Sequence, residues 1–172
     1  MEIQKVQVDL QSEIAKFLPA DYSDAYECCV DVGLEVPAED LLVAIWTDFP
    51  GWVIFLLKLR NLLVKPLGLK GAEDFGRGFF EKCIRHGECG EMVSVPAKSC
   101  DEAVLRVIDK HLTFHMSIQI KRGMAKSLVL VNTLVNFNNS LGRFYFFWIK
   151  PFHALVVKSM IRHRVASLKK LK

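Results

Sequence analysis

The sequence has little of what marks several large classes of protein. No apolar stretch approaches the ~20 residues of a membrane-spanning helix, because the longest runs, Trp52–Leu57 and Phe144–Ile149, each end at a lysine. Only 10 glycines and 6 prolines occur among 172 residues, which excludes collagen-like and low-complexity chains. Intrinsic disorder is excluded as well, since it requires low hydrophobicity and 51% of these residues are apolar. We therefore expect one folded domain over residues 1–172 with no transmembrane span, and contact with a membrane surface stays open.

A strong excess of either charge is also lacking. The chain contains 23 lysines and arginines against 19 acidic residues, which gives a net charge of +4. Part of this excess lies near the C-terminus, where Lys169, Lys170 and Lys172 follow one another closely. Nucleic-acid-binding proteins have a denser basic face with aromatic or polar readers among the cations. We expect no nucleic-acid partner.

The cysteines and glycines form no recognised cofactor or metal motif. Five cysteines is an odd number, and Met1–Leu10 lacks the apolar core of a secretory signal, so unpaired thiols in the cytoplasm are expected. Cys83, His86 and Cys89 lack the Cys-x2–4-Cys spacing of structural zinc sites, so no metal is expected. The glycines of residues 68–90 do not form a phosphate-binding loop, and no cofactor is expected.

The first half of the chain predicts two strands and three helices. After an N-terminal extension over residues 1–20 that contains a short helix at Ser12–Leu18, Asp21–Val30 is typical of a strand. Pro37 begins a helix whose apolar residues recur at helical spacing. A second helix is expected over Trp52–Val64, with Trp52, Phe55, Leu56, Leu59 and Leu63 on one side. Residues 68–90 are expected to form a loose connection with a strand at Phe79–Ile84.

The second half predicts a strand meander and a long helix. Four strands are expected at Glu91–Val95, Glu102–Ile108, His111–Lys121 and Lys126–Phe137, and their short connections favour antiparallel pairing. Ser140 is expected to cap a final helix over Leu141–Leu171, which Pro151 should bend. This helix carries an apolar face with Phe144, Tyr145, Trp148, Phe152, Leu155, Val156 and Met160, and Phe147 is placed on the opposite side. The order of elements predicts an α+β fold.

This order is that of the helix-grip fold, in which a curved antiparallel sheet wraps the last helix. Three segments resemble an uncharacterised bacterial family of unknown function that is similar to the START-like, or SRPBCC, superfamily. They are Leu59–Lys70, Asp109–Phe114, and Asn138–Tyr145 with Ile149–His153. The resemblance implies a hydrophobic cavity between the sheet and the final helix, used for lipids, sterols, polyketides or similar ligands. It brings no catalytic residues.

The candidate binding residues follow from placing the apolar face of the final helix, called here the stripe, against the sheet. Strand His111–Lys121 alternates apolar and polar side chains, so one of its faces is expected to be covered. Within the implied cavity, the sheet and helix residues expected to touch a ligand are Phe114, Met116, Ile118, Tyr145, Trp148 and Phe152. A filled core is the equal alternative for this stripe. Asp109, His111 and His115 lie on or near the polar face and are expected to meet solvent or a partner.

Three functions stay open at this point. The first is binding of a hydrophobic small molecule or lipid in the cavity. The second is a cyclase-like or aromatase-like enzyme that uses an inward-pointing acid–base group, with His111, His153 or Tyr145 as candidates. The third is a peripheral membrane or interaction domain based on the exposed side of the last helix. The sequence leaves the ligand, any turnover and the oligomeric state undetermined.

Overall fold

The computed structural model describes residues 2–31, 35–64, 78–89 and 91–168. Its elements, in chain order, are β1 (Ile3–Val6), a 3-10 helix η1 (Glu13–Phe17), β2 (Tyr22–Asp31), α1 (Ala38–Thr47), α2 (Gly51–Val64), α3 (Phe79–His86), β3 (Glu88–Cys89), β4 (Val93–Lys98), β5 (Glu102–Ile108), β6 (Leu112–Lys121), β7 (Lys126–Phe137) and α4 (Ser140–Leu168). The strands form one sheet in the order β1-β2-β7-β6-β5-β4-β3, with antiparallel neighbours throughout. The predicted α+β class with an antiparallel sheet and a long C-terminal helix is confirmed, and the arrangement is compatible with a helix-grip fold.

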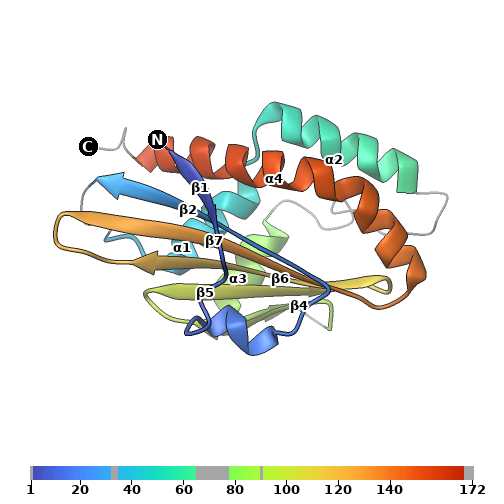
Figure 1. The fold of residues 1–172 in the computed structure, drawn as a ribbon, viewed down its shortest axis with the longest axis horizontal. Coiled ribbons are helices and arrows are strands. Elements are labelled where there is room, and N and C mark those ends of the chain that lie inside the picture. The colour runs from blue at the N-terminus through green and yellow to red at the C-terminus, as the bar shows by residue number, and fades with distance from the viewer. Residues whose placement is uncertain (1, 32–34, 65–77, 90, 169–172) are drawn as a thin grey trace.

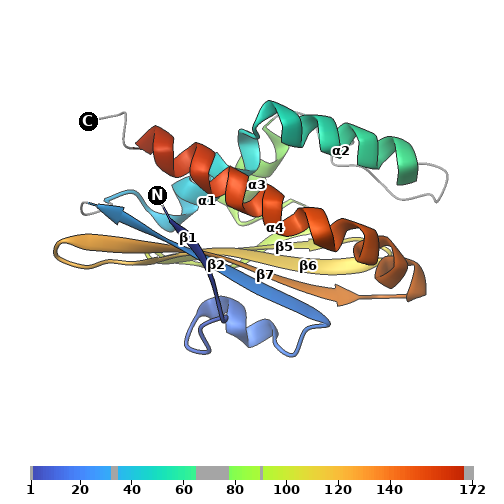
Figure 2. The same cartoon turned by 45° about the horizontal axis from the view of Figure 1, so that its top comes forward.

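The helices and the 3-10 helix lie on opposite sides of this sheet. Figures 1 and 2 show a curved, twisted sheet with α1, α3 and α4 over one face, called here the inner face, and η1 on the other. The main core lies on the inner face, where Leu41 and Ile45 of α1 pack with Met116 and Ile118 of β6. A smaller apolar cluster on the outer face joins η1 to the sheet through Ile14, Val104 and Leu134. One face of the sheet is therefore covered by helices, and the other is partly covered by η1.

The expected strand at Phe79–Ile84 is wrong, because this segment forms helix α3. Cys83 and Ile84 are fully buried and follow Phe80 at helical spacing, which a run this short does not distinguish from a strand. Gly78 and Gly87 flank the helix with φ values of 84° and 93°, a backbone region that other residues rarely adopt. The N–H of Gly87 donates to the carbonyl of Cys83 at 2.8 Å, so the helix ends at a glycine cap.

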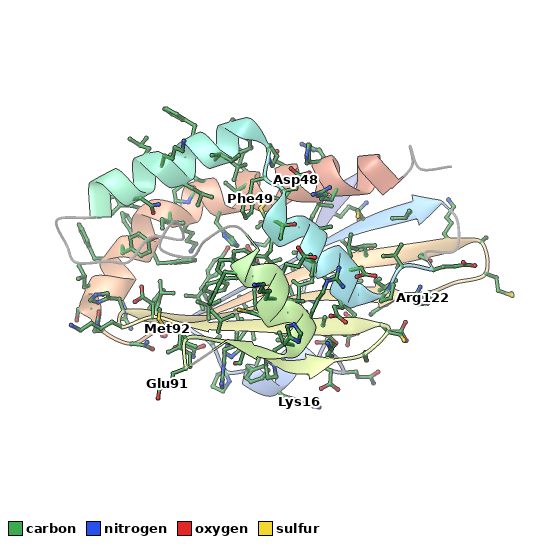
Figure 3. The ribbon with its side chains drawn as sticks, turned by 180° about the vertical axis from the view of Figure 1, so that it is seen from behind. Lys16, Asp48, Phe49, Glu91, Met92 and Arg122 are labelled. Carbon is green, nitrogen blue, oxygen red and sulfur yellow. The ribbon has the colours of Figure 1, made fainter. Side chains whose placement is uncertain are left out.

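Helix α4 has the expected position but the opposite face toward the sheet. Phe146, Val157 and Ile161 are buried, whereas Phe144, Trp148, Phe152 and Leu155 of the expected inward stripe are exposed, and of that stripe Met160 is buried as expected. Both faces of this helix are apolar, so helical spacing alone could not tell which of them packs on the sheet. The helix continues through Pro151, and Figure 1 shows that it changes direction along its length, as expected. At its other end, Arg164 contacts Asp48 at 2.6 Å, and Figure 3 labels Asp48 at the α1–α2 junction.

Helix α2 exposes much of its apolar surface. Trp52, Phe55 and Leu59, which were predicted on one side of the helix, are exposed, and Val53 is buried. Figures 1 and 2 show α2 on the side of α4 that faces away from the sheet. A hydrogen bond from Nε1 of Trp52 to Oγ of Ser159 at 3.2 Å joins the two helices. Because α2 lies outside the main core, its apolar residues are left at the surface.

The turn before β6 is joined to the start of α4 by backbone and amide hydrogen bonds. The N–H of Asn138 donates to the carbonyl of His111 at 3.0 Å, and its side-chain amide donates to the carbonyl of Asp109 at 2.7 Å. The side chain of Asn139, not that of Ser140 as expected, caps the helix by accepting the N–H of Gly142 at 3.0 Å. Two of the segments that carry the family resemblance, Asp109–Phe114 and Asn138–Tyr145, are therefore hydrogen-bonded to each other.

Candidate functional site

The structure divides the six predicted binding residues between two places. Phe114, Met116 and Ile118 lie on the inner face in the main core, and Phe114 stacks on Trp46 of α1 with ring centroids 5.7 Å apart. Trp46 in turn stacks on Phe80 of α3 at 5.2 Å. The space expected to hold a ligand beside Phe114 is therefore occupied by side chains of α1 and α3.

The residues predicted on the last helix do not face that row. Trp148 is 63% exposed, and Phe152 is exposed beside it along the helix. The aromatic partners of Trp148 are Phe144 and Phe147 on its own helix, at 6.4 and 5.8 Å. Tyr145 is partly buried. The expected apposition of this stripe with Phe114, Met116 and Ile118 is wrong, and a binding role for any of the six stays a prediction.

A pocket does lie between the sheet and the final helix, two strands away from Phe114. It has a volume of about 160 Å³ and opens where β2 begins, β7 ends and α4 starts. Tyr22 and Phe114 share this sheet face, because each is paired with Val135 of the intervening strand β7. The lining residues are Asp21, Tyr22, Phe137, Arg143, Phe146, Phe147 and Lys150.

Aromatic walls and two cations give this pocket its chemical character. The ring of Phe146 lies 4.8 Å from that of Tyr22 and 5.5 Å from that of Phe137. The ammonium of Lys150 lies 5.4 Å from the centre of the Tyr22 ring, and the guanidinium of Arg143 lies 5.8 Å from that of Phe137. Both are cation–π distances. Asp21, which is partly exposed, lies 3.9 Å from Arg143. It is the one carboxylate among the described residues that line the pocket, beside two cations, so the lining carries an excess of positive charge.

Below the pocket, a buried chain of polar groups joins β2 to α4. The hydroxyl of Tyr22 donates to Oδ2 of Asp24 at 2.6 Å, and Nε2 of His153 lies 3.4 Å from the same oxygen. The Asp24 side chain is fully buried, and its Oδ1 has no hydrogen-bond partner among the described residues. A carboxylate held between a phenol and an imidazole can orient the imidazole and stabilise its charged form.

The pKa values reflect these contacts. Burial by itself would raise the pKa of Asp24, but the interactions with His153 and with the Tyr22 hydroxyl outweigh burial and lower the pKa below its ordinary value of 3.8. Burial and the bond to Asp24 raise the pKa of Tyr22. Tyr26, on the same face of β2, has a pKa raised by burial to about 12. At neutral pH this chain of polar groups therefore contains an ionised Asp24 carboxylate and a neutral Tyr22 phenol.

Asp24 also borders a second recess, at the outer edge of β2. Strand β1 pairs only with Ala25–Cys28, so the first residues of β2 have no neighbouring strand on that edge. A recess of about 340 Å³ lies there, lined by Lys5, Val6, Gln7, Val8, Leu18, Ser23 and Asp24. Asp24 thus belongs both to the buried polar chain and to the wall of this recess.

His111 and His115, which were expected to meet solvent or a partner, are both buried. The ring of His115 stacks on Phe17 of η1, with centroids 4.2 Å apart, and burial with the nearby Arg106 charge lowers the pKa of His115 to about 4. His111 contacts the Asn139 side chain through Nδ1 at 3.0–3.2 Å. The outer face is less open than the alternation in β6 predicts, because η1 packs on it, and neither histidine lines the pocket.

Asp24 and Tyr22 are functional candidates that the sequence analysis did not identify. A signal for them exists, because the period of two places Tyr22, Asp24 and Tyr26 on one face of β2 with Cys28 and Val30. One carboxylate in an otherwise apolar row indicates a buried acid with a partner. Sequence alone could not identify that partner, since His153 lies 129 positions further along the chain.

The cysteine-containing segment shows no metal chemistry within the described residues. No group of three or more His, Cys, Asp or Glu side chains among them could hold a metal ion. Cys29 and Cys100 are free thiols, whereas Cys83 is disulfide-bonded. The expectation that every cysteine is unpaired is therefore wrong for Cys83.

Comparison with known proteins identifies a family without a known activity. The family model described as "Protein of unknown function (DUF2867)" matches residues 17–160. This range includes the strands β2 to β7, the pocket and the Asp24–His153 pair. No curated protein matches the sequence.

Proposed function

Since the chain belongs to the DUF2867 family, from which no activity can be carried over, we propose that it binds a hydrophobic small molecule or lipid with an acidic group, in the pocket between β2, β7 and α4. The observation that carries this proposal is the lining, in which the aromatic rings of Tyr22, Phe137, Phe146 and Phe147 stand beside Arg143 and Lys150. An apolar body would pack on the rings, and a carboxylate or phosphate would accept hydrogen bonds from the cations.

The size of the pocket limits what it can enclose. Pockets for drug-sized ligands commonly measure roughly 300–1,000 Å³, and this one measures about 160 Å³. A larger ligand would therefore have only its headgroup and first atoms enclosed, with the remainder against the exposed side of α4 beyond Phe147. The START-like resemblance belongs to this proposal too, supported by the antiparallel sheet, the C-terminal helix and a pocket between them.

Laurate, compared with its neutral analogue lauryl alcohol, provides the test. Titration calorimetry should show laurate binding to the wild-type protein, and Arg143→Gln with Lys150→Gln should weaken it about tenfold, the effect of losing hydrogen bonds to a charged group. The affinity for lauryl alcohol should change much less. Lys158→Gln is the matched control, since this lysine is on the same helix but contacts the ring of Tyr26 outside the pocket. Equal weakening of both ligands, or no binding of laurate, would contradict the proposal.

An acid–base enzyme is the second candidate, and the Asp24–His153 pair favours it. With Nε2 of His153 directed at Asp24, its Nδ1 is left to accept a proton from a carbon acid bound above Phe146. Ethyl acetoacetate in D2O provides a probe, since a general base accelerates exchange of its acidic C–H hydrogens. Exchange above the buffer rate that is lost in His153→Gln and kept in His163→Gln would support this candidate. Exchange at the buffer rate with the wild-type protein would count against it.

A further inference from the structure

The largest unexplained feature of the surface is an apolar face formed by α2 and α4. Twelve large hydrophobic side chains are exposed among the described residues, and nine of them belong to these two helices. On α4 they are Phe144, Phe147, Trp148, Phe152 and Leu155, and on α2 they are Trp52, Ile54, Phe55 and Leu59. The most exposed of the nine are Phe147 at 68% and Phe55 at 65%. Single exposed apolar residues are ordinary, but a set gathered on adjoining helices indicates an interaction surface.

The residues on α4 form a continuous stripe along one side of the helix. Phe144, Phe147, Trp148, Phe152 and Leu155 follow the i, i+3, i+4, i+8, i+11 spacing of one helix face. The opposite side holds Phe146 and Val157 against the sheet. Helix α2 extends this surface sideways, because Trp52 is hydrogen-bonded to Ser159 of α4 and Figure 2 shows α2 on the side of α4 away from the sheet. We call the nine exposed residues the α2/α4 face.

The charged residues of α2 and α4 themselves have a single sign. Neither the α2 sequence nor the α4 sequence contains an aspartate or a glutamate. Among the described side chains, Arg143, Lys150 and Arg162 of α4 and Lys58 of α2 are exposed cations. Exposed aromatic residues with bordering cations are the composition of helices that lie in the interface of an anionic membrane.

We propose that the α2/α4 face docks on the surface of an anionic lipid bilayer. Its aromatic and aliphatic side chains enter the region between the headgroups and the acyl chains, and the bordering cations contact lipid phosphates. The docking is peripheral. Among the residues that the structure describes, no single helix has the length and apolar content for crossing a membrane. Helix α1 and residues Gly51–Leu59 have that length and apolar content only when they are taken together, and a bend of 64° separates them.

A second copy of the chain fits this face less well than a bilayer does. A two-fold symmetric contact places each patch against its own copy, so the cations of α2 and α4 would meet cations. No carboxylate on either helix could compensate for that repulsion. An anionic bilayer supplies both an apolar layer and negative charge, and so matches both properties of the face.

Vesicle flotation measures the docking without any small ligand. The wild-type protein should float with vesicles of phosphatidylcholine and phosphatidylserine, and much less with phosphatidylcholine alone, and salt should weaken the binding. The double variant Trp148→Ser, Phe152→Ser should reduce the partition coefficient at least about tenfold, since it removes two exposed aromatic groups that the bilayer would bury. The matched apolar control is Met124→Ser, which removes a fully exposed methionine from the β6–β7 turn.

The charge contribution has its own pair of variants. Lys58→Gln with Arg162→Gln should weaken binding to phosphatidylserine vesicles several-fold, whereas Lys126→Gln at the far end of β7 should not. None of these residues lines the pocket. Vesicle binding can therefore be absent while laurate still binds, and laurate binding can be absent while the protein still binds vesicles. Absence of flotation, flotation unchanged by the double serine variant, or a dimer in sedimentation that this variant dissociates without any vesicle binding would overturn the proposal.

Discussion

Nε2 of His153 on α4 lies 3.4 Å from Oδ2 of Asp24 on β2, and this contact joins the final helix to the sheet directly below the pocket. The pair lies on the side of α4 that meets the sheet, and Phe152 and Leu155 are left at the surface. The pocket, the buried carboxylate and the exposed α2/α4 face therefore follow from one orientation of one helix.

Replacing Asp24 by asparagine tests the contribution of this buried carboxylate to stability. In Asp24→Asn the side-chain amide oxygen would still accept the Tyr22 hydroxyl, but the charge facing His153 would be lost. We expect the free energy of unfolding at pH 7 to fall by about 1–3 kcal/mol in urea denaturation. Glu27→Gln, on the opposite face of the same strand, should change it by no more than about 0.5 kcal/mol.

The pH dependence of that difference follows from the pKa of Asp24. Because the folded-state pKa is lowered below 3.8, the carboxylate stabilises the fold fully above that value and loses its contribution as the pH falls through the folded pKa. The gap between the wild-type protein and Asp24→Asn should therefore close as the pH falls below 3.8. A gap that persists unchanged well below that pH would show that the ionised Asp24 carboxylate is not its cause.

The lowered pKa of His115 predicts a separate loss of stability in mild acid. Its pKa is lowered from 6.5 to about 4 in the folded protein, so the unfolded chain binds the proton first as the pH falls. Stability should be complete above about pH 6.5 and decrease by up to about 3 kcal/mol by pH 4. His115→Gln should flatten this part of the profile. His86→Gln, an exposed substitution, should leave it in place, and a profile equally steep in both variants would refute the assignment.

Gly142→Ala tests the close approach of α4 to the turn before β6. A Cβ at this position would overlap the carbonyl oxygen of His111, and backbone atoms cannot rotate away as a side chain can. We expect a loss of about 1–3 kcal/mol in thermal or urea unfolding. Gly51→Ala is the matched control, because a Cβ there meets nothing within 4 Å and should be neutral or stabilising at the start of α2. Equal effects of the two substitutions would contradict this packing.

Alanine substitutions on the two sides of α4 test its orientation. Phe146 is 6% exposed and contacts Tyr22, Phe137 and His153, so Phe146→Ala should cost about 3–5 kcal/mol of unfolding free energy. Phe144 is 60% exposed, and Phe144→Ala should cost less than about 1 kcal/mol. The reverse ranking would mean that the side of the helix facing the sheet has been assigned wrongly.

Much of the fold could be predicted from the sequence, because the strands after residue 91 carry clear signals. The alternation through β6 and the short turns on either side indicate both the strands and their antiparallel pairing. α1 and the extent of α4 followed from helical spacing. Phe79–Ile84 was assigned wrongly, because four apolar residues in an eight-residue helix are too short a run for helical spacing to decide the assignment.

The candidate site was less predictable, for two physical reasons. Apolar residues surround α4 almost completely, so the choice between Phe146 and Trp148 as its inward residue depends on what the helix meets in three dimensions. The identity of the residue covering Phe114 also depends on tertiary packing, because Trp46 and Phe80 come from helices that the sequence does not place over β6. By contrast, Asp24 was detectable as the single acid on the inner face of its strand.

The most direct measurement of the central claim is a crystal structure with a bromine-tagged fatty acid, in which anomalous scattering locates the chain and the map locates the carboxylate. We predict that the carboxylate lies between Arg143 and Lys150, and that the first part of the chain lies against Phe146 and Phe147. A ligand found beside Phe114 under α1 and α3, or crystals in which the protein binds none, would contradict the account.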